Sequence, residues 1–161
     1  MTHDGHDSPP SLRRHLPDEA ATLALGAALA RRLAPGMTVW LTGALGAGKT
    51  TLVRGLLRAL GYTGRVKSPT FALVEVYPFS SFTLYHFDLY RLSDPLEWEE
   101  AGLREYFNAR SLCLIEWPER AAGRLPAADV EIRLEFAADG RQALLQGRTE
   151  AGRACVRGLA T

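Results

Sequence analysis

The spacing of apolar residues predicts alternating helices and strands through most of the chain. From Asp18 to about Leu33, alanines and leucines recur at helical spacing, as on the buried face of a helix. Asp18 is a residue type that caps helix N-termini, and the Pro35–Gly36 pair ends the helical pattern. The apolar run 37–42 then predicts a buried strand, and leucines at helical spacing predict a second helix from Lys49 to about Leu60.

The second half of the chain is richer in strand patterns. Residues 112–115 form a continuous apolar run, which is typical of a central parallel strand buried on both faces. In the run 82–89, Tyr85 and Phe87 share one face while His86 and Asp88 share the other. The other expected elements are a strand over 71–77 antiparallel to 82–89, a helix over 95–107, strands over 130–136 and 141–147 joined at Asp139–Gly140, and a short helix from about residue 150.

Between the first predicted strand and the second helix lies a phosphate-binding motif. The segment 43–50, GALGAGKT, has the form G-x-x-x-x-G-K-[ST] in the strand–loop–helix context that a P-loop requires. Its glycines let backbone N–H groups converge on phosphate oxygens, and the following helix adds the positive end of its dipole. Lys49 is expected to reach the β- and γ-phosphates, and the Thr50 hydroxyl to bind Mg²⁺. The residues expected in the phosphate cradle are Gly43, Leu45, Gly46, Ala47, Gly48, Lys49 and Thr50.

Together these patterns predict an α/β fold with a single domain over residues 18–161. We expect a P-loop NTPase-like three-layer domain, with a mixed, mostly parallel sheet and an antiparallel edge. Residues 1–17 contain histidines and prolines with little apolar periodicity, so we expect a flexible N-terminal tail there.

Composition and charge narrow the class of protein. The chain has 161 residues, of which 47% are hydrophobic and 23% charged, ordinary values for one globular domain. A net charge of +1 lacks the basic excess with which proteins hold nucleic acid unaided. The two cysteines lack metal-ligand spacing. We find no signal peptide and no apolar run of membrane-spanning length, so we expect a cytoplasmic protein that does not bind membranes.

Hydrolysis of a bound nucleotide needs a carboxylate near Mg²⁺ and a positioned water in addition to the loop. Glu116 directly follows the buried run 112–115, where α/β sheets place ligand-binding groups. Asp88 is the second candidate, either to orient the water or to hold Mg²⁺, although a strand aspartate can equally lack such a role. Thr70 is a candidate switch residue that responds to the γ-phosphate. His86 is interpreted as a structural hydrogen-bonding residue rather than a base.

The identity of the base is predicted partly by what the sequence lacks. The chain has no Asn/Thr-Lys-x-Asp segment of the kind that guanine-specific switch proteins use, so we expect ATP. The start of the first helix, residues 18–26 with Thr22, is a candidate wall of the adenine pocket.

Several segments, in this order along the chain, resemble the bacterial TsaE (YjeE) family. They are GALGAGKTT (43–51), VKSPT (66–70), LVE (73–75), YHFDLYRL (85–92) and IEWP (115–118). The resemblance runs from about Leu16 to Glu131, and ordinary P-loop enzymes do not combine these segments at these spacings. It implies an Mg²⁺-dependent ATPase that supports formation of N6-threonylcarbamoyladenosine in tRNA, next to the anticodon. It also implies that the chemistry on tRNA belongs to TsaD, held with TsaB, so that tRNA is reached through these partners.

The resemblance also implies roles for single residues. Thr70 becomes the switch residue, Asp88 an acidic group needed for hydrolysis, and Glu116 an Mg²⁺-associated carboxylate. With Thr50, both carboxylates are expected at the metal. The residues implied to contact the nucleotide are Gly46, Gly48, Lys49, Thr51 on the α-phosphate side, and Trp117.

Two alternatives remain at this point. The first is a small-molecule or nucleotide kinase on the same loop; a kinase needs an Arg-rich lid, whereas the segment 92–108 is acidic and predicted to be helical. The second is a nucleotide-dependent binding switch without useful hydrolysis.

Overall fold

Seven strands form one mixed sheet in the computed structural model, which describes residues 10–69 and 72–160. The strand order is β1-β7-β6-β2-β5-β4-β3, in which the four strands β6, β2, β5 and β4 are parallel to one another. Antiparallel pairs lie at both edges, β3 with β4 on one side and β7 with β6 and β1 on the other. The strands are β1 (Ser11–Leu16), β2 (Thr38–Thr42), β3 (Val74–Pro78), β4 (Thr83–Asp88), β5 (Ser111–Glu116), β6 (Val130–Ala137) and β7 (Gly140–Gly147).

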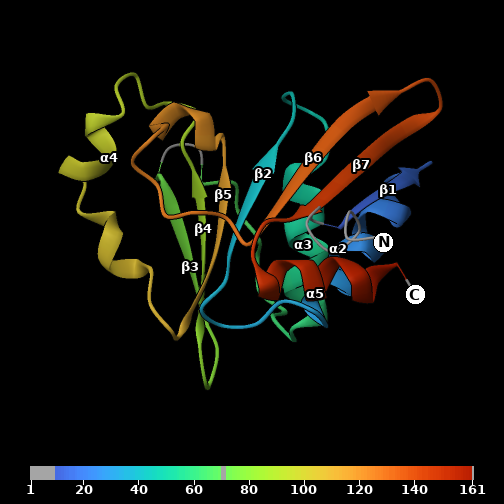
Figure 1. Ribbon diagram of the computed structural model, residues 1–161, viewed down its shortest axis with the longest axis horizontal. Helices are drawn as coiled ribbons and strands as arrows, with labels where there is room; N and C mark the ends of the chain where they lie inside the picture. Colours follow the sequence, from blue (N-terminus) through green and yellow to red (C-terminus); the bar gives the residue numbers. More distant parts are fainter. Residues whose placement is uncertain (1–9, 70–71, 161) are drawn as a thin grey trace, which may run out of the picture.

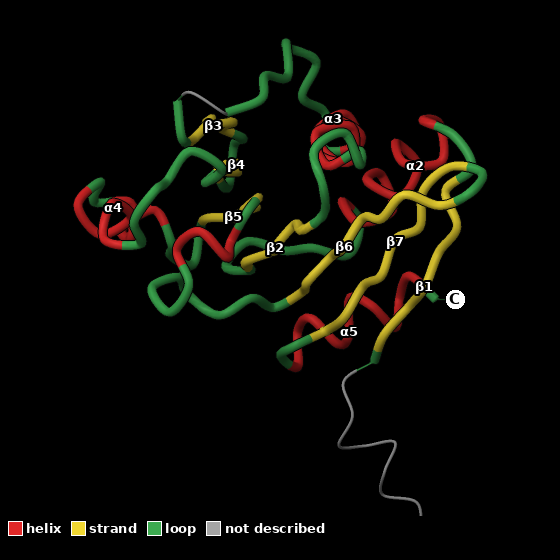
Figure 2. Tube along the Cα trace, turned by 90° about the horizontal axis from the view of Figure 1, so that it is seen from above, coloured by secondary structure: helices red, strands yellow, loops and turns green. Residues whose placement is uncertain are grey.

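Helices cover the two faces of the sheet unequally (Figures 1 and 2). The long helices α2 (Glu19–Ala30), α3 (Lys49–Ala59) and α5 (Glu150–Leu159) share one hydrophobic core with the sheet. The short helix α4 (Leu96–Glu100) and the 3-10 helices η1 (Leu103–Tyr106) and η2 (Pro118–Ala121) share a second core with the opposite face. The predicted three-layer α/β arrangement and mixed sheet are therefore confirmed.

The alternation of side chains along β4 and β5 explains both cores. Leu84 and Leu114 point into the core under α3, while Phe87 and Ile115 point into the core under α4, so the central strands are buried on both faces.

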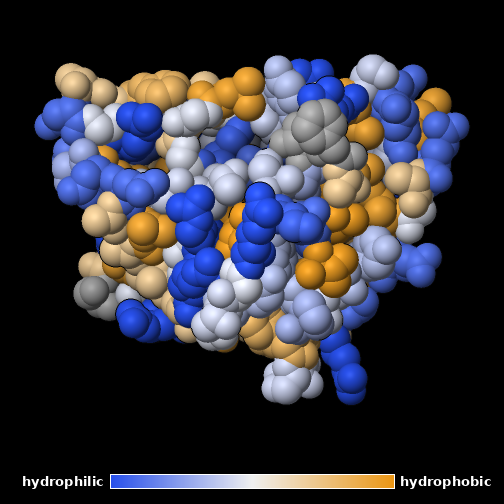
Figure 3. All heavy atoms as spheres, turned by 180° about the vertical axis from the view of Figure 1, so that it is seen from behind, coloured by the Kyte–Doolittle hydropathy of each residue, from blue (hydrophilic) through white to orange (hydrophobic). Residues whose placement is uncertain are grey.

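Towards solvent, the helical layer carries hydrophilic side chains interspersed with smaller hydrophobic groups, as seen from behind in Figure 3. The amphipathic helices α3 and α5 thus turn their apolar faces inward.

The expected N-terminal tail over residues 1–17 is wrong for residues 11–16. This segment forms β1, which pairs antiparallel with β7 from Ser11↔Gln146 to Leu16↔Arg141. Its pattern is hard to recognise because an edge strand has one exposed face and this one carries several basic side chains. Leu16 is nevertheless fully buried and belongs to the main core. Residues 1–9 lie outside the described part of the chain.

The helix predicted over 95–107 is also wrong in its extent. It is split into α4 and η1, and Gly102 between them has a left-handed backbone with φ of 67°. The break lets Trp98 before it and Leu103 after it enter the same core. The other predicted helices and strands are present with ends shifted by a few residues.

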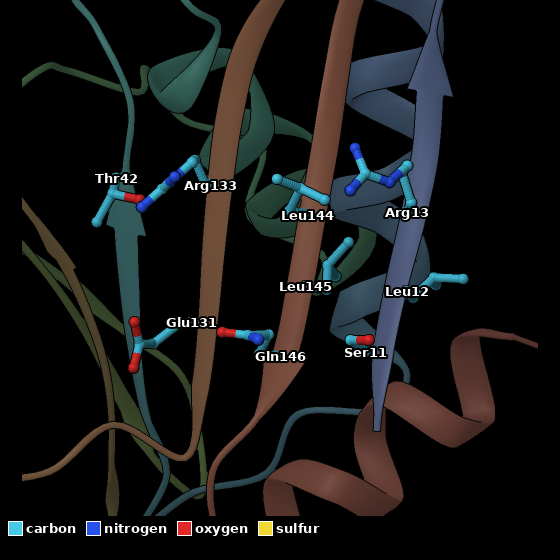
Figure 4. Close-up of a pocket in the computed structure, with 9 residues that line it drawn as sticks. All are labelled: Ser11, Leu12, Arg13, Thr42, Glu131, Arg133, Leu144, Leu145 and Gln146. Carbon is cyan, nitrogen blue, oxygen red and sulfur yellow. The ribbon is translucent and has the colours of Figure 1, made fainter. Parts of the chain in front are cut away.

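On the side of β2 that carries β6, β7 and β1, the second face of the sheet is uncovered and has a hollow of about 370 Å³. Figure 4 shows the residues that line it. It is lined from β1, β2, β6 and β7, with the side chain of Arg133 directed towards Thr42. None of the predicted site residues lines this hollow. Over the residues that the structure describes, no helix is both long enough and apolar enough to cross a membrane.

Candidate functional site

The glycine-rich loop occupies the junction between β2 and α3, as the motif predicts. Gly48 caps α3 with a left-handed backbone, φ 107°, a conformation that other residues adopt only at a cost. The next residue, Lys49, begins the helix and is almost completely buried. The loop thus directs the helix N-terminus, with its unpaired N–H groups, at the space beyond the end of β2.

A hollow of about 230 Å³ adjoins this loop and brings together residues that lie far apart in the sequence. Asp88 and Glu116 lie directly opposite each other at the C-terminal ends of the parallel strands β4 and β5. Both carboxylates are buried, at 5% and 4% exposure. The lining residues are Leu45, Gly46, Gly48, Lys49, Thr50, Thr51, Ser68, Asp88, Glu116 and Trp117. All of these except Ser68 are residues that the sequence singled out.

A second hollow of about 260 Å³ lies on the other side of the loop. It shares Gly46, Gly48 and Thr51 with the first hollow and is also lined by Ala47 and Thr22. Thr22, the candidate wall of the adenine pocket, thus lines the same hollow as Thr51. Further walls come from the β1–α2 junction and from Gly140 and Arg141 at the β6–β7 turn. Thr70 lies outside the described residues.

The lysine of the loop is held by neutral groups. Its Nζ donates a 2.6 Å hydrogen bond to the carbonyl oxygen of Gly43 and lies 4.0 Å from the centre of the Trp117 ring. Burial lowers the pKa of Lys49, and the carboxylates of Glu116, Asp88 and Glu119 oppose this shift in part. A buried ammonium whose charge is only partly compensated by nearby carboxylates strongly favours the binding of a polyanion.

Trp117 is held in an unusual backbone conformation. Its φ of 59° lies in the left-handed region, which costs a non-glycine residue about 1 kcal/mol or more. The ring packs against Tyr90 at 5.0 Å between centroids, and the Arg120 guanidinium lies over both rings, at 5.3 Å and 5.9 Å. The strained turn thereby places an aromatic surface next to the Lys49 ammonium.

Each carboxylate of the site has a defined hydrogen bond. Glu116 Oε2 lies 2.6 Å from the ring Nε2 of His86, and both side chains are buried. Asp88 Oδ1 accepts a 2.9 Å bond from the backbone N–H of Tyr90. The two carboxylates are therefore oriented before any ligand binds.

The donor set suits Mg²⁺ held together with a nucleotide. Thr50, Asp88 and Glu116 contribute oxygen atoms to the same hollow. Among residues 10–69 and 72–160, no group of three or more His, Cys, Asp or Glu side chains is arranged to hold a metal alone. Mg²⁺ is commonly bound through one or two carboxylates, with substrate phosphates and water completing its shell, so these residues fit it.

Comparisons with known proteins show to which family this chain belongs. The family model described as "Threonylcarbamoyl adenosine biosynthesis protein TsaE" matches residues 16–154. This chain belongs to the TsaE family. The tRNA threonylcarbamoyladenosine biosynthesis protein TsaE of Haemophilus influenzae is 46% identical over 148 residues, which cover 89% of this chain and 94% of that protein.

Other TsaE-family members extend the match to a solved structure. The TsaE protein of Bacillus subtilis is 41% identical over 124 residues, covering 76% of this chain and 75% of its own. A crystal structure of YdiB from the same species matches with a TM-score of 0.77 and 28% identity, over 94% of each chain. The fold is therefore shared along nearly the whole length.

Sequence reasoning missed several residues of this TsaE-family site. Ser68 lines the phosphate-side hollow, and it stands in the VKSPT segment, which was a signal for it. Arg141 lines the second hollow and donates a 3.3 Å bond to the Gly46 carbonyl oxygen. Nothing local to Arg141 indicates this contact, because it joins segments 95 residues apart in the sequence. The contact of His86 with Glu116 likewise depends on strand register.

Proposed function

We propose that this protein is an Mg²⁺-dependent ATPase that supports the TsaB–TsaD complex in forming N6-threonylcarbamoyladenosine in tRNA. The observation that carries the ATPase proposal is the single hollow in which the P-loop meets Asp88 and Glu116. Membership of the TsaE family supports the link to tRNA modification. The partners are proposed from that family alone.

The proposed reaction is attack of water on the γ-phosphorus with cleavage of the terminal phosphoanhydride bond. The loop N–H groups and Lys49 bind the phosphate oxygens and stabilise the charge that develops on them. Asp88 orients the water, while Thr50 and Glu116 hold the metal. Mg²⁺, when bound with ATP, neutralises phosphate charge. Thr22 and the second hollow receive the adenosine part.

Hydrolysis rather than transfer to a metabolite is supported by the position of the 92–108 segment. A kinase on this scaffold needs an acceptor pocket and a lid over the phosphates. Here Trp98 and Leu103 from this segment are buried in the core on the opposite face from α3. The segment is thus used for packing rather than as a lid.

The decisive experiment measures ATP turnover with and without TsaB–TsaD. We expect weak turnover alone and a clear rise with the partners. Glu116→Ala and Asp88→Ala should keep much of the nucleotide affinity and lower turnover about 100-fold or more, because they remove groups that act in the transition state.

Glu100→Ala is the matched control, since this glutamate is exposed on α4 and lies outside both hollows. Normal turnover by Glu116→Ala would disprove the metal role. Turnover unchanged by TsaB–TsaD, together with phosphate transfer to a metabolite, would replace the proposal with the kinase.

A further inference from the structure

His86 lies on a face of β4 between the core residue Leu84 and the carboxylate residue Asp88. Along β4, the residues facing α3 are Leu84, His86 and Asp88, and on the neighbouring strand Leu112 and Leu114 face the same core. His86 is completely buried, at 0% exposure. A leucine here would simply extend the core, so packing does not call for an imidazole.

Within residues 10–69 and 72–160, the polar contact of the buried ring is with Glu116. A carboxylate oxygen only accepts, so the 2.6 Å contact assigns the hydrogen to His86 Nε2. The ring Nδ1 has no hydrogen-bond partner among the described residues. Burying such a polar atom without a partner is unfavourable. The fold therefore accepts a cost to place a hydrogen-bond donor beside Glu116.

Without this donor, the carboxylate of Glu116 would have a competing partner. Glu116 and Lys49 line the same hollow, and the carboxylate of Glu116 interacts electrostatically with the Lys49 ammonium. Rotation towards Lys49 would pair the carboxylate with the lysine that the phosphate needs. The bond to His86 fixes Oε2 on the side of β4.

We infer that His86 is a positioning residue, which orients the Glu116 carboxylate for the metal that accompanies the nucleotide. The inference rests on the proposed Mg²⁺-dependent binding of ATP. His86 itself does not touch the reacting atoms; it acts through Glu116. A hydrogen-bonding partner of a metal-bound group typically changes metal affinity 10- to 100-fold when it is removed.

Two amide variants distinguish a positioning role of His86 from a role in packing alone. In His86→Gln the amide nitrogen can occupy the position of the ring Nε2 and donate to Glu116. In His86→Asn the shorter side chain places its amide near the position of Nδ1, out of reach of Glu116. Both variants are polar and smaller than histidine, so they differ mainly in whether the donor reaches.

The measurement is the affinity for a fluorescent, non-hydrolysable ATP analogue as Mg²⁺ is titrated, with a parallel series in EDTA. We expect His86→Asn to raise the Mg²⁺ concentration for half-maximal tightening about 10-fold, with affinity in EDTA within about twofold of the original protein. His86→Gln should restore the requirement to within about threefold. His15→Asn, at an exposed histidine on β1, is the matched control and should change nothing.

Equal Mg²⁺ requirements in His86→Asn and His86→Gln would overturn the inference. So would loss of affinity in EDTA by both variants, since that result would assign His86 a purely structural role. Failure of the unaltered protein to bind the analogue in an Mg²⁺-dependent way is a different result, because it would refute the proposed function itself.

Discussion

The two halves of the sheet carry their charged residues in opposite ways. Around β2, β5 and β4, the side chains of Lys49, His86, Asp88 and Glu116 are all at most 5% exposed. Around β6 and β7, ion pairs such as Arg148–Glu131, at 2.7 Å, have side chains that are 44% and 31% exposed.

The two groups of charges differ in how much they affect the stability of the fold. Exposed pairs stay hydrated and contribute at most about 1 kcal/mol each. Buried ionisable groups lose hydration, and clusters of such groups are found preferentially at functional sites. The buried cluster coincides with the P-loop, whereas Glu131 and Arg133 of the outer half line a hollow that contains none of the predicted site residues.

The largest expected effect concerns the two buried cysteines. It tests whether both halves of the molecule exclude water equally well. Burial raises the pKa of Cys113, on β5, to about 12 and that of Cys155, on α5, to about 11. At pH 8 the thiolate populations should be about 1,000-fold and 100-fold below those of solvent-exposed thiols, whose ordinary pKa is 9.0. The check is the rate of modification by a disulfide reagent in the native protein and in urea, with each site identified by mass spectrometry.

The raised pKa values of the two thiols also make stability depend on pH. A thiol with a raised folded-state pKa contributes stability below its unfolded pKa, and this contribution is lost as pH rises towards the folded value. Unfolding midpoints should therefore fall above about pH 9. Fast native modification of one cysteine alone would mean that its half of the molecule admits water.

The next effect concerns the buried ammonium. Lys49→Ala should weaken nucleotide binding roughly 10- to 100-fold, because hydrogen bonds between charged partners contribute about 1.5–3 kcal/mol. Lys67→Ala is the matched control, since Lys67 is the other of the two lysines in the chain and is exposed. Calorimetric titration with ATP measures both, and equal affinities would contradict the role of the buried cation.

The smallest effect is expected in the outer half. Arg148→Ala removes both the Glu131 ion pair and a 3.0 Å bond to Gln146, yet it should lower the free energy of unfolding by less than about 1 kcal/mol. Urea denaturation at low and high salt measures this change, and most of it should disappear in high salt. A decrease of several kcal/mol in the free energy of unfolding would contradict the proposed difference between the two halves.

Local patterns were sufficient for much of the fold and part of the site. The P-loop, the cap at Asp18 and the buried strand before Glu116 are each encoded within a few consecutive residues. The alternation of side chains in 82–89 correctly predicted which residues share each face of β4. These predictions succeeded because capping, turn formation and side-chain alternation depend on residues close in the sequence.

The sequence by itself determined most of the helices and strands, the P-loop motif and the buried strand before Glu116. Only the tertiary structure decided that 11–16 is an edge strand, that Arg141 lies beside Gly46, and that His86 bonds to Glu116. Each of these contacts depends on strand register or on the approach of distant segments, to which local spacing is insensitive. The polar groups of the site meet because parallel strands β4 and β5 end at the same edge, opposite the N-terminus of α3.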